Sequence, residues 1–492
     1  MVGIGGRSRG CKTCRRARVK CDQNQPICFR CARLKLQCQG FNPFPVFIDG
    51  LSLNEIKADN ATEGDGKKET SLVPAPSLDE DNIFTTHLIM TLFIPFQGSN
   101  TVPNPSLSLW LMSSILPSDH PQAPQLAVRA CAAAYFGKIH RQFSAAERGT
   151  VLYTKALRQL QKELFDSEQV LKTDTLSATL LLALFEMITS KDMNGWLSHL
   201  LGVGHLIKFR GPQAHRDGSG KELFLTTRPS IILAYLIRRQ RCFLEEDAWK
   251  TVPWADQPDS KTSMDCLNDI FCHLPGVMED LKIPLKRTDA VDEPKISDII
   301  LCFQIKALFE KLYNWRVKWE QDFSHTYFNV GLNSLKDLNV FELDSYPFPT
   351  AIFFTEHIRV AEICIYNAML LLLHQACRQL PASIRPTVTS YENTYSWPRP
   401  SVLLAPGDGS VEDIIGEFCK LVYFQLLSYP GNTGAIQIMF PLQVSYRNVN
   451  PESMEARWLY KIISHIADCC GFDAFASLFI MKTKQRSSLL EL

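Results

Sequence analysis

Residues 10–22 read GCKTCRRARVKCD, and residues 23–40 continue QNQPICFRCARLKLQCQG. This stretch holds six of the sixteen cysteines of the 492-residue chain. Their spacing is C-x2-C-x6-C, then six residues, then C-x2-C-x6-C again, so the second half repeats the first after seventeen residues. The six are Cys11, Cys14, Cys21, Cys28, Cys31 and Cys38. A C-x2-C pair offers two soft thiolate ligands to one ion, so the repeat predicts a metal site.

The number of cysteines indicates how many zinc ions this site holds. One structural zinc needs four ligands, which leaves two thiolates over, and two independent zincs need eight. Histidine does not fill the gap, because the first histidine of the chain is His87. Two zincs that share two thiolates satisfy the count. The alternatives are three disulfides or six unconnected thiols. Disulfides need an oxidising compartment, and residues 1–10 have no apolar signal segment.

Positive charge is concentrated in the same segment. Residues 1–40, called the head below, hold ten of the 52 basic residues and one of the 51 acidic residues, a net charge of +9. The other 452 residues carry 42 basic and 50 acidic groups, a net charge of −8. Six thiolates and two zinc ions would leave the head at about +7. This asymmetry predicts a polyanion such as nucleic acid as the partner.

The run from Gly10 to Asp22, with Pro26 before Cys28, resembles the DNA-binding domain of fungal binuclear zinc-cluster transcription regulators. The resemblance implies two zinc ions bridged by the first and fourth cysteines, Cys11 and Cys28. It implies that Pro26 shapes the loop between the two halves. It also implies recognition of CGG triplets in the major groove of double-stranded DNA.

Four basic residues between the second and third cysteines are the candidate DNA contacts. They are Arg15, Arg16, Arg18 and Lys20. If residues 12–19 are helical, Arg15 and Arg18 share one face and Arg16 and Lys20 share another. One face can then enter the groove while the other grips phosphate.

Arg18 is the expected base reader. In the family, a basic residue three positions before the third cysteine reads the bases, and Arg18 matches that position. Its guanidinium suits O6 and N7 of guanine. The preceding position, often basic in relatives, is Ala17, which places more of the reading on Arg18. The second half carries Leu34 and Leu36 and is expected to be a packing and support half.

Residues 41–86 are predicted to form a mostly disordered acidic linker. They contain nine acidic and three basic residues and four prolines. Because no heptad pattern is visible, a coiled coil is not expected here, and any homodimer is expected to pair through the helical body. Leu78–Phe84 is typical of a linker, with an activation segment as the alternative.

Residues 87–492, the helical body, show mainly helical apolar spacing. The fold class is therefore mainly α: a small zinc-cluster domain, a linker and a large all-α regulatory domain. One helix is expected over residues 174–188 and another from Asn194 to the stop signal Gly211-Pro212. Residues 196–212 resemble the fungal-specific transcription-factor domain that accompanies these clusters. In that family the domain is helical and serves regulation, partner contact and sometimes effector sensing.

Several features argue against other classes of protein. The sequence has no HExxH, GxSxG, P-loop or GxGxxG motif, so catalysis is not expected. His199 and His205 are six residues apart, which is not a same-face ligand spacing. The ten cysteines outside the head have mostly apolar neighbours and are expected to be buried. The best membrane candidate, Leu176–Ile188, is too short and contains Glu186.

The sequence thus predicts a nuclear, zinc-dependent, sequence-specific regulator of RNA polymerase II genes. Its expected partners are double-stranded DNA and the transcription machinery or co-regulators, and a local metabolic gene cluster is a candidate target. One alternative is a regulator whose helical body senses a small metabolite. Another is an interaction scaffold whose basic head binds RNA or another polyanion.

Overall fold

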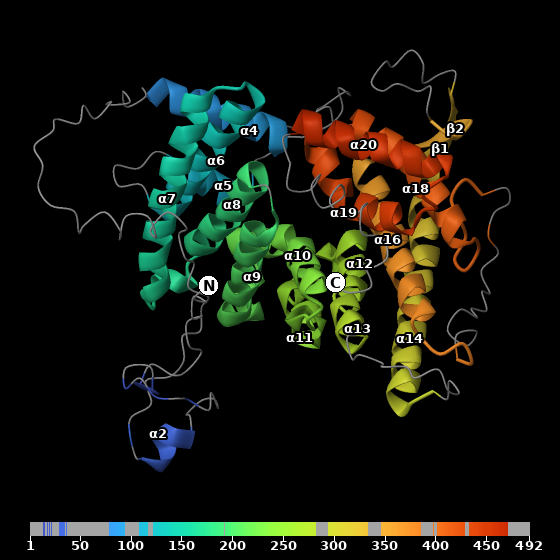
Figure 1. Ribbon diagram of the computed structural model, residues 1–492, viewed down its shortest axis with the longest axis horizontal. Helices are drawn as coiled ribbons and strands as arrows, with labels where there is room; N and C mark the ends of the chain where they lie inside the picture. The colour runs from blue at the N-terminus through green and yellow to red at the C-terminus, as the bar shows by residue number, and fades with distance from the viewer. Residues whose placement is uncertain are drawn as a thin grey trace, which may run out of the picture. The chain divides into compact units, whose positions relative to one another are not determined.

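The computed structural model describes most of the helical body and part of the head. The described residues are 78–93, 108–116, 122–190, 192–281, 294–332, 346–384, 397, 401–428 and 432–470, and in the head Thr13, Cys14, Ala17, Val19, Cys21, residues 29–34 and Leu36. The chain divides into two compact units, Met1–Leu72 and Val73–Leu492. The second unit is built almost wholly of helices (Figure 1), which confirms the mainly α fold class.

The first half of the helical body packs around helix α6 (Ala123–Ile139), against which α4, α7 and α8 lie (Figure 1). Small residues on α6 let these helices approach closely. A Cβ at Gly149 of α7 would lie 2.7 Å from the backbone nitrogen of Ala134, so only glycine fits there. The helices of this half are α4 (Leu78–Leu92), α5 (Leu109–Ile115), α6, α7 (Phe143–Phe165), α8 (Thr173–Thr189), α9 (Asn194–Arg210) and α10 (Gly218–Arg238).

The two helices expected from residues 174–188 and from Asn194 are confirmed as α8 and α9. The α9 residues spaced for one face, Trp196, Leu200, Val203 and Ile207, are all buried. Gly211 ends α9 with a φ of 77°, a left-handed conformation that favours glycine, and Pro212 then begins a 3-10 turn.

The linker prediction is wrong at its C-terminal end, because helix α4 begins at Leu78. Phe84 is buried, with its ring centroid 4.5 Å from that of Phe136 on α6. Asp81 pairs with Arg148 of α7 at 2.5 Å. Residues 78–86 therefore belong to the helical body, because their apolar side chains pack at helical spacing and the charge of Asp81 is neutralised by Arg148. The rest of the predicted linker lies outside the described residues.

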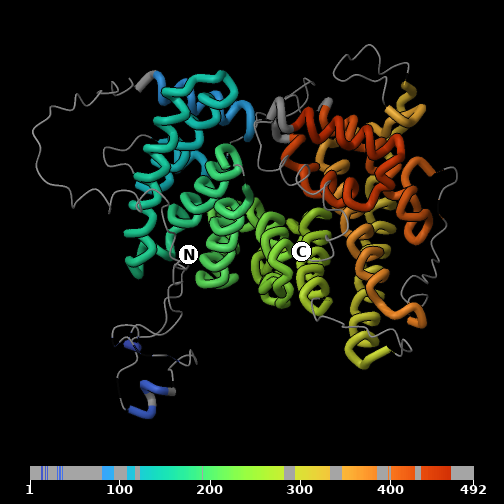
Figure 2. The backbone as a smooth tube through the Cα atoms, in the orientation of Figure 1, coloured from blue at the N-terminus to red at the C-terminus, as the bar shows by residue number. Residues whose placement is uncertain are grey.

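A set of short elements leads from the first half to the second. They are η3 (Phe243–Glu245), α11 (Asp247–Thr251), η4 (Val252–Trp254), η5 (Pro258–Ser260), α12 (Ser263–Phe271) and α13 (Leu274–Asp280). Helix α12 contacts α10 on one side and α14 and α16 on the other, so α11–α13 lie between the two halves (Figure 2). The helices of the second half are α14 (Ile296–Phe323), α16 (His357–Arg378), α18 (Val411–Ser428), α19 (Asn432–Asn448) and α20 (Met454–Cys470).

The second half also contains a β-hairpin beside the helices of the predicted regulatory domain. Strands β1 (Tyr327–Gly331) and β2 (Thr350–Phe354) pair antiparallel, with Tyr327 opposite Phe354. Their sequences, YFNVG and TAIFF, are rich in aromatic and β-branched residues.

Helix α16 is the core of the second half and contacts α18 and α19. It is long and apolar enough to cross a membrane, but 78% of its apolar window is buried inside the structure. A buried core helix accounts for that composition. Seven cysteines of the body are buried, as predicted: Cys131, Cys242, Cys272, Cys302, Cys364, Cys377 and Cys419. Cys266 is half-buried.

Candidate metal centre and nucleic-acid interface

Two short helical turns carry cysteines of the head, and they have the same backbone pattern. In each turn one amide N–H donates to the carbonyl four residues back and another to the carbonyl five residues back, at 3.0 to 3.1 Å. These bonds join Ala17 to Thr13 and Val19 to Cys14 in the first turn, and Leu34 to Arg30 and Leu36 to Cys31 in the second. Each position in the second turn is seventeen residues after its equivalent, so the repeat of the sequence is also a repeat of the backbone.

The equivalent cysteines of the two turns converge. The Sγ atoms of Cys14 and Cys31 lie 4.0 Å apart, and both side chains are buried. Zn–S bonds are about 2.3 Å long, so the thiolates of one small cluster lie only a few ångströms from one another. The two halves therefore bring thiols to a separation that suits a compact zinc–thiolate cluster.

Arg30 also lies at this site, although the sequence marks it only as one of the basic residues of the head. Its Nη1 donates toward the Sγ of Cys14 at 3.7 Å and is part-buried. The guanidinium thus places a positive charge beside a sulfur that the repeat assigns to zinc. The signal in the sequence is its place directly before Cys31, which puts it on the turn that faces Cys14.

The structure places only some of the predicted site residues. Cys14 and Cys31 are together, and Cys21 is half-buried in the same unit. The other site residues lie outside the described part of the chain: Cys11, Cys28, Cys38, Arg15, Arg16, Arg18 and Lys20.

Two expectations about the head need correction. The helix expected over residues 12–19 is shorter, because Val19 is not helical and its N–H bonds five residues back, which closes the turn. Leu34 and Leu36, expected to pack, are both exposed.

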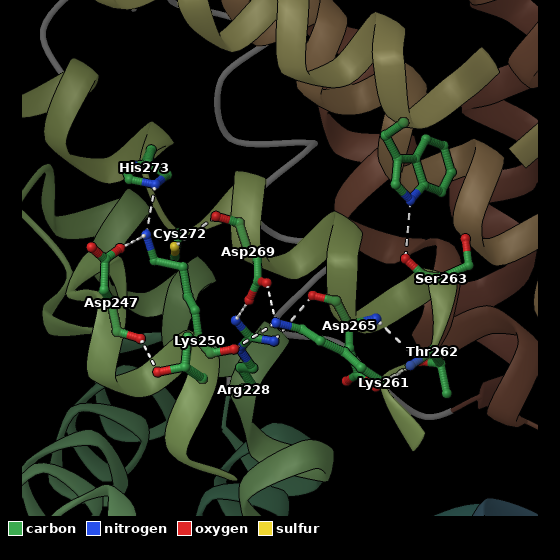
Figure 3. Close-up of polar contacts among 12 residues, drawn as sticks. Arg228, Asp247, Lys250, Lys261, Thr262, Ser263, Asp265, Asp269, Cys272 and His273 are labelled. Carbon is green, nitrogen blue, oxygen red and sulfur yellow. Dashed lines mark hydrogen bonds and ion pairs between the residues drawn. The ribbon is translucent and has the colours of Figure 1, made fainter. Parts of the chain in front are cut away.

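The helical body contains an ion-pair network between α10 and α12 (Figure 3). Arg228 is fully buried on α10, pairs with Asp269 of α12, and donates from Nη1 to the carbonyl of Asp265 at 3.1 Å. Lys261 pairs with the same Asp269 carboxylate, and its Nζ lies 4.5 Å from the ring centroid of Trp254. Because the buried guanidinium of Arg228 bonds to both Asp265 and Asp269, it links α10 to α12.

Two potentially reactive groups beside this network are inert. Burial raises the pKa of the Cys272 thiol to about 12, and burial lowers the pKa of His273 to about 4. Near pH 7 the thiol is therefore protonated and the imidazole neutral, so the pair supplies neither a nucleophile nor a charged acid. Among the described residues no group of three or more His, Cys, Asp or Glu side chains is placed to hold a metal.

The two histidines considered in the sequence have the core and surface roles expected of them. His199 is buried, lies 3.1 Å from the hydroxyl of Tyr153 through Nε2, and has its pKa lowered to about 4 by burial. His205 is exposed. They lie on different faces of α9 and do not form a joint site.

Two protein-family models match parts of the chain. Residues 9–45 match the fungal Zn(2)-Cys(6) binuclear cluster domain, and residues 84–236 match the fungal specific transcription factor domain. The chain thus carries both domains of the fungal binuclear zinc-cluster transcription factors, as the sequence predicted. A domain of the first kind binds two zinc ions. Neither matched family is an enzyme class.

The chain is also similar to parts of several fungal proteins. It is 39% identical over 129 residues to an uncharacterized protein of Emericella nidulans, which covers 26% of this chain and 27% of the relative. It is 53% identical over 36 residues to an uncharacterized transcriptional regulatory protein of Schizosaccharomyces pombe, 7% of each. Sterol uptake control protein 2 of Candida albicans is 38% identical over 77 residues, 16% of this chain and 10% of that protein. The matches thus span about a quarter or less of each relative, and no solved structure matches the chain.

Proposed function

We propose that this protein is a zinc-dependent, sequence-specific regulator of RNA polymerase II transcription that binds CGG-type triplets in double-stranded DNA. The observation that carries the proposal is the pair of equivalent turns whose buried thiols, on Cys14 and Cys31, lie 4.0 Å apart in the most basic segment of the chain. The transcriptional regulatory protein from fission yeast, which matches over 36 residues, supports the same class.

In this proposal the six cysteines of the repeat hold two zinc ions, with Cys11 and Cys28 as shared ligands. The domains are the head at residues 1–40, a linker that ends where α4 begins, and the helical body. Zinc supplies the fold of the head and no chemistry, because a site closed by thiolates leaves no open position for substrate.

The four basic residues make two kinds of DNA contact: hydrogen bonds to a base, which select sequence, and contacts to phosphates, which do not. Arg18 reads a guanine through its guanidinium, and Arg15, Arg16 and Lys20 grip phosphates. The net charge of +9 in residues 1–40, set against −8 elsewhere, supports binding dominated by the phosphate backbone.

Replacing Arg18 with Ala is expected to cost about 1–3 kcal/mol of binding free energy on a CGG duplex and to relax selectivity within the triplet. Lys20→Ala is the matched control: it should weaken all duplexes about equally and reduce the salt slope by about one unit. Fluorescence anisotropy of the full chain on CGG and scrambled duplexes at two salt concentrations separates the two. An equal loss on both duplexes for Arg18→Ala would contradict the reading role.

A nuclear location and contact with co-regulators follow from this function, and a metabolic gene cluster beside the gene is a candidate target.

Two experiments address the alternative functions, a ligand-sensing body and a polyanion-binding scaffold. A metabolite that raises the unfolding temperature of the full chain would favour a ligand-sensing body. Equal binding of RNA and CGG duplex at physiological salt would favour a polyanion-binding scaffold.

A further inference from the structure

Two histidines from different helices meet at the surface of the helical body. His87 lies on α4, and His140 directly follows the last residue of α6. Their Nε2 atoms lie 3.2 Å apart, with His140 exposed and His87 half-buried. The two residues are 53 positions apart in the sequence, so only the packing of α4 on α6 brings them together. The two nitrogens thus face each other where solvent can reach them.

The separation of the two nitrogens matches that of two ligands on one metal ion. Zn–N bonds are about 2.0–2.1 Å long, so two nitrogens bound to one tetrahedral zinc lie about 3.3 Å apart. The alternative is a hydrogen bond between the rings, for which 3.2 Å is at the long end of the usual range. In that bond one Nε2 keeps its proton, whereas zinc takes the lone pairs of both nitrogens.

The surrounding side chains hold both imidazoles in place. The ring centroid of Phe136 lies 5.3 Å from that of His87 and 4.3 Å from that of His140. The ring of Tyr135 lies 5.7 Å from His87 on the same helix as Phe136. The Nδ1 atom of His87 is buried, which leaves Nε2 as its nitrogen available to a metal. A pair of ligands that is already oriented loses little freedom when it binds an ion.

Burial and the neighbouring His140 lower the pKa of His87 from its ordinary value. Its imidazole is therefore neutral above pH 7, which is the form that binds metal. Imidazole nitrogen suits zinc and the related divalent transition metals. The geometry and the protonation state thus agree with a metal site.

We propose that His87 and His140 form a weak zinc site in the helical body and that zinc bound there fastens α4 to α6. Water completes the coordination, because among the described residues no group of three His, Cys, Asp or Glu side chains is placed to hold an ion. Two imidazoles hold zinc less tightly than a closed set of thiolates, so this site fills when free zinc rises and empties when it is removed. The anchoring of α4, the first helix after the linker, then depends on free zinc.

The first test counts zinc. Full-length protein with zinc already in the head is dialysed above pH 7 against free zinc raised stepwise to about 0.1 mM, where a site of micromolar affinity is saturated. Wild type is expected to take up one more zinc per chain than His87→Gln or His140→Gln. His205→Gln is the matched control, because His205 is also an exposed histidine of the helical body, and it should behave as wild type. Removal of free zinc should return all four proteins to the same zinc content.

The second test measures whether bound zinc fastens α4. Hydrogen exchange of residues 78–92, followed by mass spectrometry, reports the local opening of this helix. Opening separates the two histidines, so free zinc at ten times its dissociation constant should slow this exchange about tenfold in wild type and in His205→Gln. Exchange in His87→Gln and His140→Gln should not respond to zinc.

Three results would overturn the proposal. If wild type took up no additional zinc, a hydrogen bond would account for the pair. Additional zinc that remained in both His87→Gln and His140→Gln would be held by other groups. Zinc uptake without slower exchange in α4 would contradict the fastening role. Because His140 lies at the surface, His140→Gln keeps the test valid if His87→Gln fails to fold. None of these results involves DNA, so a failure here is distinct from a failure of DNA recognition.

Discussion

Chelation of zinc from the full-length protein is expected to abolish DNA binding while the helical body stays folded. A head of about forty residues cannot bury enough apolar surface to fold alone, so the free energy of metal binding is its folding free energy. In zinc-finger peptides the free energy of zinc binding is about 10–16 kcal/mol at pH 7, far larger than the contribution of any single side-chain contact. Circular dichroism should keep nearly all its helical signal, while the head becomes sensitive to protease.

Cysteine variants test how the metals are shared. Cys11→Ser or Cys28→Ser should disturb both zinc ions, whereas Cys38→Ser should first affect one. Cys266→Ser is the control, since Cys266 is a half-buried cysteine of the helical body. Metal analysis should return two zinc ions per chain for the wild type and for this control. One zinc per wild-type chain would contradict the shared-ligand arrangement.

Loss of the negative charge on Asp269 is expected to destabilise the helical body strongly. Arg228 is fully buried, and its guanidinium carbon lies 5.3 Å from the ring centroid of Trp254 (Figure 3 shows the ion pair). Asp269→Asn leaves that cation without its anion, and removing one partner of a buried pair costs about 3–5 kcal/mol. Urea unfolding followed by circular dichroism measures the loss, and Trp254 fluorescence reports it locally.

The exposed pair Arg216–Asp256 supplies the control for this prediction. It joins residues 40 positions apart, close to the 41 of the buried pair, but its side chains are 38% and 57% exposed. Asp256→Asn should therefore have a much smaller effect. The double variant Arg228→Met/Asp269→Leu should recover part of the loss, because apolar groups then replace both charges. If Asp269→Asn were no more harmful than Asp256→Asn, the network would not be a structural link.

Local signals in the sequence predicted the parts of the structure that depend on neighbours along the chain. The seventeen-residue repeat of cysteines reappears as matching backbone bonds at Cys14 and Cys31. The end of α9 follows from Gly211, whose left-handed φ few other residues adopt easily. Both the backbone bonds of each turn and the end of α9 depend on residues that lie only a few positions apart in the sequence.

Features that depend on distant residues were not predictable in the same way. Arg228 looks like a surface residue in the sequence, because its partner Asp269 is 41 positions away. The acids of residues 79–81 favoured a linker, but Arg148, far along the chain, neutralises Asp81. The pairing of β1 with β2 likewise depends on two short segments that only the tertiary fold brings together.

A sequence preference that depends on zinc separates a DNA-reading head from one that is merely basic. The affinity of the full chain is determined on a duplex with paired CGG triplets and on a scrambled duplex of the same composition, with zinc bound and after chelation. The account predicts that the zinc-loaded protein prefers the CGG duplex by at least about tenfold, or about 1.4 kcal/mol, and that chelation removes the preference. Equal affinity for the two duplexes with zinc bound, or a preference that survives chelation, would contradict it.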